Sequence, residues 1–354
     1  MLARIRQGCQ RAVVKDRLFG YACRMKSAGK LSGKSGKGGS RKAYAALPAK
    51  TVTIAVCVAA AVLFAVFAAA WYLVSFALDT RSRHGSPSEE ISPEKTALWD
   101  SLAPLGQPVS VTADDGLILH GTLFTPAGRN APGGRWVIAV HGYKSLPASM
   151  APLAARYLEK GWTVLVPEQR SHGKSAGRYI GMGFFEKNDL VRWTEFAAAR
   201  DPAARILLHG VSMGAATVML ASALDLPDNV AAAVEDCGYS SLTEEFTAQL
   251  ADMFSLPAFP LIPAASLVCR LRAGFFFRDV DCTAAVASSS IPVLFIHGEA
   301  DRFVPFWMLD KLYAAAACGK ARLTVPGAEH AMSEETDPQQ YWAAVDAFTA
   351  RYFR

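Results

Sequence analysis

The clearest candidate for chemistry is Ser212, in the middle of the motif G-V-S-M-G at 210–214. A stretch typical of a strand, 205–209, precedes the motif, and a stretch typical of a helix, 213–225, follows it. A serine on such a sharp strand-to-helix turn exposes its hydroxyl at a helix N-terminus, where the helix dipole favours negative charge. An ordinary Ser/Gly turn that caps a helix is the alternative. The order of strand, motif and helix favours a nucleophile.

A serine hydroxyl needs a base that accepts its proton, and a carboxylate that orients that base. Of the seven histidines, His330 has the best position, in the loop 327–331 between the last predicted strand and the last predicted helix. Asp301 follows the predicted strand 292–297 and is the preferred carboxylate. Glu299 and Asp236, which also follow strands, remain alternatives. The sequence therefore predicts acyl transfer through a serine, a histidine and an aspartate.

The negative oxygen that forms during acyl transfer needs two N–H donors. The backbone N–H of Met213, directly after the serine, would be one donor. The backbone N–H of Tyr143, after the strand that ends near His141, would be the other. The sequence has no C-x-x-C motif and no Cys/His cluster with the spacing of zinc ligands. We therefore expect neither a metal nor an organic cofactor.

Short β-branched stretches alternate with helical stretches from about residue 107 onward, which is typical of a mainly parallel sheet with helices on both faces. The two leading strands are expected to form an antiparallel hairpin at one edge. The predicted strands are 108–113, 117–124, 135–140, 163–167, 205–209, 230–235, 292–297 and 321–325. The predicted helices are 149–160, 184–200, 213–225, 306–318 and 338–351.

One segment, 241–285, is too long for a single crossover helix and contains several prolines. It is predicted to be a cap of short helices inserted between two strands. Its aromatic side chains either form an apolar substrate pocket or fill the core of the cap, and the sequence leaves both interpretations open. These side chains are Phe254, Phe259, Phe275, Phe276 and Phe277.

Charge is distributed unevenly along the 354 residues, although the formal net charge is only +6. Residues 1–50 hold 13 Lys or Arg and a single acidic residue, Asp16, and residues 51–78 hold no ionisable group. The remainder, 79–354, carries 24 basic and 30 acidic residues. A nucleic-acid-binding domain concentrates positive charge on its folded part. Because the positive charge lies outside the predicted domain, we expect no nucleic-acid partner.

The uncharged segment 51–78 is long enough to cross a bilayer, which takes roughly 20 apolar residues. A cleaved signal peptide is the alternative, but its apolar region is usually about 7–15 residues long. Because basic flanks stay in the cytoplasm, the N-terminus is expected inside and the C-terminal domain outside the cell membrane. The predicted organisation is a flexible basic segment 1–50, a transmembrane helix 51–78, a linker 79–106 and a catalytic domain 107–354.

Four of the seven cysteines fall in the part of the chain that would be exported. An oxidising compartment permits disulfides, but buried free thiols are an equal alternative. These residues are Cys237, Cys269, Cys282 and Cys318.

Five motifs follow one another in the order found in the α/β-hydrolases: HGYKS at 141–145, EQRSHGKSAG at 168–177, GVSMGA at 210–215, HGEADRFVP at 297–305 and GAEH at 327–330. The chain resembles the bacterial membrane-anchored "cell surface hydrolase" type, related to serine aminopeptidases and esterases. The resemblance implies the α/β-hydrolase fold, with an eight-stranded sheet and a small helical cap.

The same resemblance implies a triad of Ser212, Asp301 and His330, with Tyr143 and Met213 at the oxyanion hole. In the block at 168–177, Glu168 stands where an aspartate is common, and His172 is interpreted as a residue that orders the loop. That block is structural, so the departure does not put catalysis in doubt.

The predicted reaction is hydrolysis of a carboxylic ester through an acyl-enzyme, and cleavage of a peptide or amide is the second hypothesis. A hypothesis of another class is a membrane-tethered binding protein that keeps the fold without catalysis. The expected partners are a membrane, through 51–78, and a small-molecule or lipid-like ester or a peptide. The sequence predicts no oligomeric state.

Overall fold

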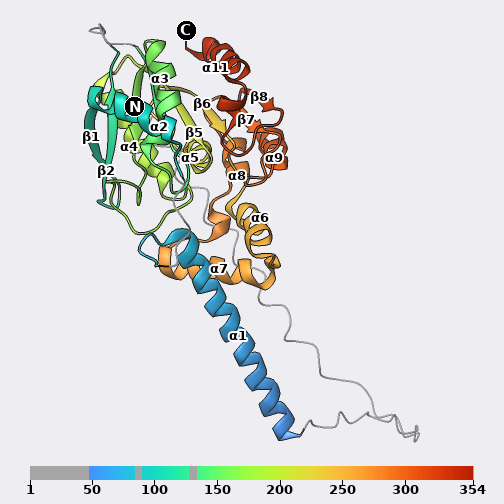
Figure 1. The fold of residues 1–354 in the computed structure, drawn as a ribbon. Coiled ribbons are helices and arrows are strands. Elements are labelled where there is room, and N and C mark those ends of the chain that lie inside the picture. Colours follow the sequence, from blue (N-terminus) through green and yellow to red (C-terminus); the bar gives the residue numbers. More distant parts are fainter. Residues whose placement is uncertain (1–47, 84–89, 127–133, 354) are drawn as a thin grey trace, which may run out of the picture. The chain divides into compact units, whose positions relative to one another are not determined.

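The computed structural model describes residues 48–83, 90–126 and 134–353. The chain divides into two units, Met1–Thr53 and Ile54–Arg354, and the second unit holds the sheet and the helices that pack on it (Figure 1).

The centre of the second unit is an eight-stranded sheet with the order β1-β2-β4-β3-β5-β6-β7-β8. The pairs β1–β2 and β2–β4 are antiparallel, and all other neighbouring strands are parallel. The fold prediction, including the antiparallel hairpin at one edge, is thus confirmed. The strands are β1 (Gln107–Thr112), β2 (Ile118–Phe124), β3 (Arg135–Val140), β4 (Thr163–Pro167), β5 (Arg205–Val211), β6 (Val230–Asp236), β7 (Val293–Gly298) and β8 (Lys320–Val325).

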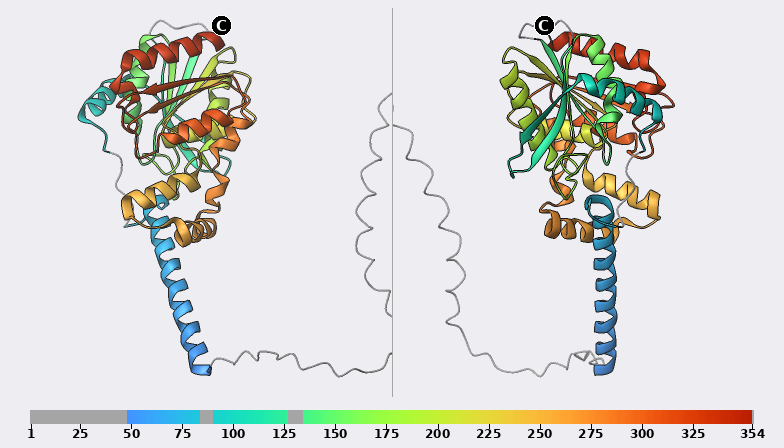
Figure 2. Two further views of the ribbon diagram at one scale, coloured as in Figure 1. Left: turned by 90° about the vertical axis from the view of Figure 1, so that its right-hand side faces the viewer. Right: turned by 60° about the vertical axis from the view of Figure 1, so that its left-hand side comes forward.

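Helices cover both faces of the sheet, and each face has its own hydrophobic core (Figure 2). The central strands β4, β6 and β7 are buried along their whole length, as expected for parallel strands covered on both sides. One core includes residues of α4 (Glu186–Arg200), α5 (Met213–Ala221), α8 (Cys282–Ala287) and α9 (Trp307–Ala315). The other includes residues of α3 (Ala151–Glu159) and α11 (Pro338–Tyr352).

Between β6 and β7 the chain forms α6 (Leu242–Phe254), α7 (Ala258–Ala273) and the short helix η3 (Phe277–Asp279) before α8 returns to the sheet. We call α6, α7 and η3 the cap. Ser241 begins α6 by accepting a hydrogen bond from the backbone N–H of Glu244, and Gly274 ends α7 in the left-handed conformation that favours glycine.

The apolar segment near the N-terminus forms one helix, α1 (Ala49–Leu78), which is long and apolar enough to be a candidate membrane span. Most of its side chains are exposed, but Ala70, Val74 and Leu78 are buried against the rest of the second unit. These three residues are four positions apart and therefore share one face of the helix. The sequence assigned all of 51–78 to a membrane, whereas in the structure the last two turns of α1 pack on the rest of the second unit.

The segment after α1, which the sequence predicts to be a linker or a short helix, contains a helix. The helix α2 (Pro93–Leu102) begins at Ser92, whose side chain accepts a hydrogen bond from the backbone N–H of Lys95. The short elements η1 (Ala103–Leu105), η2 (Pro147–Met150) and α10 (Ser333–Thr336) complete the fold. All five cysteines in the described part of the chain, Cys57 among them, are free thiols.

Candidate active site

Ser212 occupies a strained turn between β5 and α5, with φ 56° and ψ −118°. A side chain at Gly210 would approach the carbonyl oxygen of Gly214 to 2.2 Å, and one at Gly214 would approach that of Val140 to 2.1 Å. Only glycine fits at either position. The two glycines therefore let the turn close tightly while holding the serine in a conformation that L-residues rarely adopt.

The structure brings together the three residues that the sequence singled out. The Nε2 atom of His330, in the loop after β8, lies 2.9 Å from the Oγ atom of Ser212. The Nδ1 atom of the same ring lies 2.8 Å from the Oδ2 atom of Asp301, which follows β7. A neutral imidazole that donates from Nδ1 to the carboxylate accepts at Nε2, so this arrangement can remove the proton of the serine hydroxyl.

Asp301 is buried and held from two sides. Its Oδ1 atom accepts a hydrogen bond from the backbone N–H of Val304 at 2.9 Å, and its Oδ2 atom lies 3.2 Å from Nε2 of His297. Burial raises the pKa of Asp301, but the hydrogen bonds from His297 and His330 outweigh it, and the net pKa is below its ordinary value. Asp301 therefore stays ionised and can stabilise a protonated His330.

The two alternative carboxylates have other environments. Glu299 is exposed. Asp236 is the buried last residue of β6 and accepts a hydrogen bond from the hydroxyl of Tyr341 at 3.0 Å. Burial raises its pKa to about 6, although the hydrogen bond from Tyr341 opposes the shift. Neither holds the hydrogen-bonded position on His330 that Asp301 occupies.

The loop after β3 brings Tyr143 to the same cavity as Ser212 and Met213. The backbone N–H of Lys144, next along this loop, donates to Nε2 of His172 at 2.9 Å. Burial lowers the pKa of His172 to about 4, so the ring is neutral and can accept that hydrogen bond. His172 therefore orders the loop that carries Tyr143.

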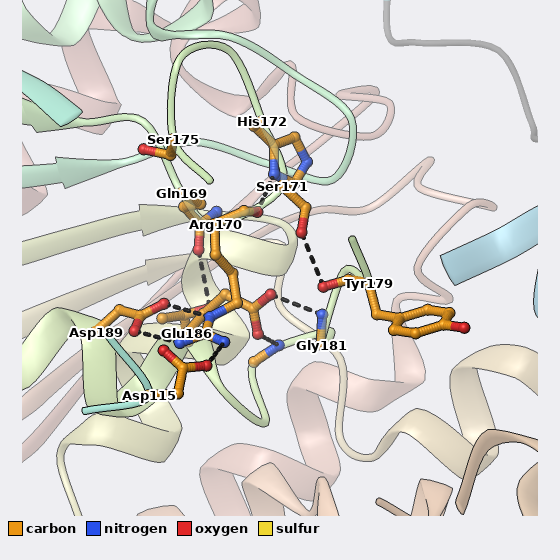
Figure 3. Close-up of polar contacts among 12 residues, drawn as sticks. Asp115, Gln169, Arg170, Ser171, His172, Ser175, Tyr179, Gly181, Glu186 and Asp189 are labelled. Atoms are coloured by element: carbon orange, nitrogen blue, oxygen red, sulfur yellow. Dashed lines mark hydrogen bonds and ion pairs between the residues drawn. The ribbon is translucent and has the colours of Figure 1, made fainter. Parts of the chain in front are cut away.

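A network of buried charges supports the segment that carries His172 (Figure 3). Arg170 makes two hydrogen bonds of 2.6 Å to the carboxylate of Asp189 and one of 2.9 Å to Asp115. Glu186 accepts hydrogen bonds from the backbone N–H groups of Gly181 at 2.7 Å and Gly183 at 2.9 Å. A bidentate Arg–carboxylate pair such as that of Arg170 and Asp189 fixes the geometry of both side chains as well as stabilising the fold. The network anchors the chain from residue 170 to α4.

Glu168, which departs from the common aspartate, closes the turn at the start of the same segment. Its Oε2 atom accepts a hydrogen bond from the backbone N–H of Lys174 at 2.5 Å. The longer side chain thus keeps a structural role.

Ser212 and His330 face a cavity of about 400 Å³. This volume lies within the range of ligand pockets, about 300–1,000 Å³. Its lining is mainly apolar and comes from α1, the cap and the loops at the carboxyl ends of the strands. The apolar side chains that line it include Leu73, Val74, Phe76, Met182, Phe246, Leu250, Met253, Phe254, Ile262, Phe277 and Phe303.

Of the five cap phenylalanines, two line the cavity, one is in the core, and two do neither. Phe254 and Phe277 line the cavity, whereas Phe275 is fully buried and stacks on Phe184 with ring centroids 4.8 Å apart. Phe259 is 79% exposed, and Phe276 lies under the guanidinium of Arg278. Neither of the two interpretations that the sequence left open therefore holds for all five side chains.

Several lining residues had no signal in the sequence. Glu245 and Gln249 of α6 line the cavity although they belong to an ordinary amphipathic helix. Glu245 is buried, and burial raises the pKa of its carboxyl to about 8. Leu73 and Phe76 belong to a uniformly apolar segment in which no position stands out. Only the tertiary contacts of these residues place them at the site.

Cys237 brings a third potential metal ligand close to the catalytic pair. Its sulfur and one ligand atom each of Asp301 and His330 all lie within 4.8 Å of one another. Burial raises the pKa of the Cys237 thiol well above its usual value, so the group is a poor ligand at neutral pH. Since Asp301 and His330 are already hydrogen-bonded to each other, this geometry fits proton transfer better than metal binding.

A strained serine after a parallel strand, with a carboxylate and a histidine that follow the last two strands of the sheet, is the site of an α/β hydrolase. The model of the Alpha/beta hydrolase family matches residues 117–344, and the chain belongs to this family. It is a hydrolase by fold and family.

Among its relatives is the uncharacterized protein YqkD of Bacillus subtilis, which is 30% identical over 213 residues, covering 60% of this chain and 70% of YqkD. The solved structure of the Pyrococcus furiosus esterase Pf2001 matches with a TM-score of 0.58 and 21% identity, covering 76% of this chain and 96% of that one. An acylaminoacyl peptidase matches with a TM-score of 0.52 and 18% identity, covering 70% of this chain and 41% of that one. At these identities the two structures show the shared fold alone.

Proposed function

We propose that the protein is a serine hydrolase that cleaves carboxylic esters through an acyl-enzyme. One observation carries the proposal: the continuous hydrogen-bonded chain from Ser212 Oγ to His330 Nε2, and from His330 Nδ1 to Asp301. A serine hydroxyl, an imidazole and an ionised carboxylate in this order can form and break acyl bonds at neutral pH.

In the proposed reaction, Oγ of Ser212 attacks the ester carbonyl carbon while Nε2 of His330 takes the hydroxyl proton. The carbonyl oxygen becomes negative and accepts hydrogen bonds from the backbone N–H groups of Tyr143 and Met213. The C–O bond to the alcohol then breaks, and His330 gives its proton to the leaving alkoxide. Water, activated by the same histidine, releases the acid and restores Ser212. Asp301 stabilises the imidazolium at both steps.

The lining of the cavity favours an ester over a peptide. An apolar surround suits an acyl chain, and one neighbour of the same fold is described as an esterase. Cleavage of a peptide or amide is the second candidate, because another neighbour is a peptidase and because Glu245 places a carboxyl group in the cavity. With a pKa of about 8, however, that carboxyl is neutral at pH 7 and a weak partner for a substrate ammonium group.

We further propose that α1 anchors the enzyme in the cell membrane, with the N-terminus in the cytoplasm and the catalytic domain outside. The support is the length and apolar character of α1, together with the 13 Lys or Arg in residues 1–50. Protease added to intact cells would digest the catalytic domain in this orientation and spare it in the reverse one.

The test of the reaction compares p-nitrophenyl butyrate with aminoacyl p-nitroanilides on the purified full chain and on Ser212→Ala. The proposal predicts Ser212-dependent ester hydrolysis that is faster than anilide hydrolysis. Faster cleavage of the anilides than of the ester would favour the peptidase or amidase function. If neither substrate is hydrolysed, and this holds across a wider panel of esters and amides, the non-catalytic binding protein becomes the better account.

A further inference from the structure

The last turns of α1 form part of the wall of the cavity. Leu73, Val74, Phe76 and Ala77 all line it, together with Ser212 and His330. The carbonyl oxygen of Ala77 accepts a hydrogen bond from the hydroxyl of Tyr143 at 2.5 Å, which joins the helix to the loop beside the nucleophile. The candidate membrane span is therefore continuous with a wall of the substrate site.

The position of this wall along α1 places it close to a bilayer surface. From Thr51 to Trp71, where Ala70 is the only buried residue, α1 has about 20 residues, and a helix of that length spans about 30 Å, the thickness of the hydrocarbon core. Trp71 and Tyr72 are each nearly half exposed, at the level where aromatic side chains favour the membrane interface. Leu73, the first residue of the cavity wall, follows directly.

The cap is fixed at the same level by Arg272, at the end of α7. Its guanidinium lies 4.3 Å from the ring centre of Trp71 and donates hydrogen bonds to Ser75 at 2.6 Å and to Asp79 at 2.8 Å. The side chains of Arg272 and Asp79 are 10% and 5% exposed, so the pair is shielded from water. Both ribbon views show α7 lying across the upper end of α1 (Figures 1 and 2).

The outer surface of this fixed cap is apolar. Leu267 and Leu271 are one turn apart on α7 and are 52% and 69% exposed, and Phe259 near its start is 79% exposed. Leu256, in the turn between α6 and α7, is 41% exposed. We call these four residues the cap stripe. An exposed apolar face beside a membrane span is typical of a helix that rests in the bilayer interface.

The cavity reaches the surface beside the cap stripe. Met253, at the end of α6, lines the cavity and is 50% exposed. The next residue, Phe254, packs edge-on against Phe76 of α1, with ring centroids 5.7 Å apart. The junction of α1 and α6 is thus apolar from the surface inward to the cavity.

We propose that the substrate is a long-chain acyl ester resident in the bilayer, and that its acyl chain enters the cavity directly from the membrane at the junction of α1 and the cap. This inference rests on the proposed serine esterase function, and it adds the substrate class and its route. The apolar stripe holds the cavity mouth against the lipid surface, so the chain moves between two apolar environments without crossing water.

The test uses the full chain reconstituted in phosphatidylcholine vesicles and two substrates with the same leaving group. Methylumbelliferyl butyrate reaches the site from water, whereas methylumbelliferyl oleate is dissolved in the vesicle bilayer. The variant Phe259→Glu/Leu271→Glu alters the cap stripe at two exposed positions that do not line the cavity. Leu105→Glu is the matched control, since Leu105 is 77% exposed and lies before β1, outside the cap.

The inference predicts that the cap-stripe variant hydrolyses the vesicle-bound oleate at least about tenfold more slowly than wild type. The reason is that an interfacial helix binds the membrane in proportion to its buried apolar area. Butyrate hydrolysis by that variant, and both activities of Leu105→Glu, should stay within about twofold of wild type.

Unchanged oleate hydrolysis by the cap-stripe variant, with normal butyrate hydrolysis, would overturn the inference and leave the esterase function standing. An equal loss on both substrates would also overturn it, since the stripe would then act on the site rather than on access from the bilayer. If wild type shows no Ser212-dependent hydrolysis of either ester, the proposed function fails first, and the inference fails with it.

Discussion

The cavity has two walls of different construction. The strand-end wall carries Ser212, Asp301 and His330 on loops that follow β5, β7 and β8, and parallel pairing fixes the positions of those loops. The helical wall consists of α1 and the cap, and contacts between segments far apart in the chain hold it together. The hydrogen bond from Arg272 to Asp79, for example, joins residues 193 positions apart.

This difference separates the two tasks of the site. Charge and proton positions on the strand-end wall have to be exact to within fractions of an ångström, and a buried sheet provides that rigidity. We propose that the helical wall determines which molecules reach the serine. Changes on the strand-end wall should therefore lower the rate with every substrate, whereas changes on the helical wall should act on substrate choice and stability.

Removal of the base should give the largest effect. His330→Ala should lower kcat for p-nitrophenyl butyrate by about 10⁴- to 10⁶-fold, because the serine then has no proton acceptor. His120→Ala is the control and should retain most of the activity, because His120 lies on β2 and does not line the cavity. A loss of less than about 100-fold in His330→Ala would show that another group acts as the base.

Substitution of the two buried carboxylates near His330 should have clearly different effects on kcat. Asp301→Asn should lower kcat by about 10⁴-fold, because the amide can no longer stabilise a protonated His330. Asp236→Asn should change it by less than about tenfold, since Asp236 is hydrogen-bonded to Tyr341 instead. Steady-state kinetics of both variants would decide the question, and the reverse order of effects would assign the orienting role to Asp236.

His172 should act through the loop that it orders. His172→Ala removes the acceptor for the backbone N–H of Lys144, so the Tyr143 donor loses its position, and kcat should fall about 10- to 100-fold with little change in KM. His209→Ala is the control for lost stability alone, because His209 of β5 is also buried but bonds to Tyr157 of α3 and Tyr341 of α11. Equal losses of kcat in the two variants would show that His172 has no specific role in ordering the loop that carries Tyr143.

One carboxyl group on each wall should contribute to the free energy of unfolding with an opposite dependence on pH. Glu245 on the helical wall has a folded-state pKa of about 8, above its ordinary value of 4.5, so its burial lowers the free energy of unfolding as pH rises from about 4.5 to 8. Asp301 has a lowered pKa, so its contribution is present above the ordinary value of 3.8 and is lost as pH falls through the lower folded-state value.

Glu245→Gln should therefore be more stable than wild type at pH 8, by about 1–4 kcal/mol, and should approach it near pH 4.5. Denaturant unfolding of the full chain in detergent at several pH values measures this. Glu244→Gln is the matched control, because the neighbouring Glu244 has a lowered pKa and pairs with Lys311. If the free energies of unfolding of the two variants changed with pH in the same way, the raised pKa of Glu245 would be contradicted.

The same comparison explains how much of the molecule could be predicted from its sequence. Strand-end chemistry leaves local signals, such as the two glycines around Ser212 and the loop positions of Asp301 and His330, and the sheet order confirms the predicted fold. The helical wall leaves no such local signal in the sequence. A uniformly apolar helix gives no sign that Val74 is buried in a protein core while Phe64 is exposed.

The cap aromatic residues show the same limit. The run of phenylalanines at 275–277 places one ring in the core, one under arginine side chains and one at the cavity, because consecutive positions point in different directions. Composition alone could not separate them. Contacts with Phe184, with Phe246 of α6 and with Arg270 of α7 distinguish the three rings.

Labelling of the full chain with a fluorophosphonate probe, followed by mass spectrometry of the modified peptide, tests the central claim most directly. The matched control is Ser149→Ala, because Ser149 also lines the cavity but its hydroxyl donates to the carbonyl oxygen of Leu146 and not to a histidine. The account predicts labelling on Ser212 in wild type and Ser149→Ala, and none in Ser212→Ala. Equal labelling of Ser212→Ala, or no labelling of wild type, would contradict it.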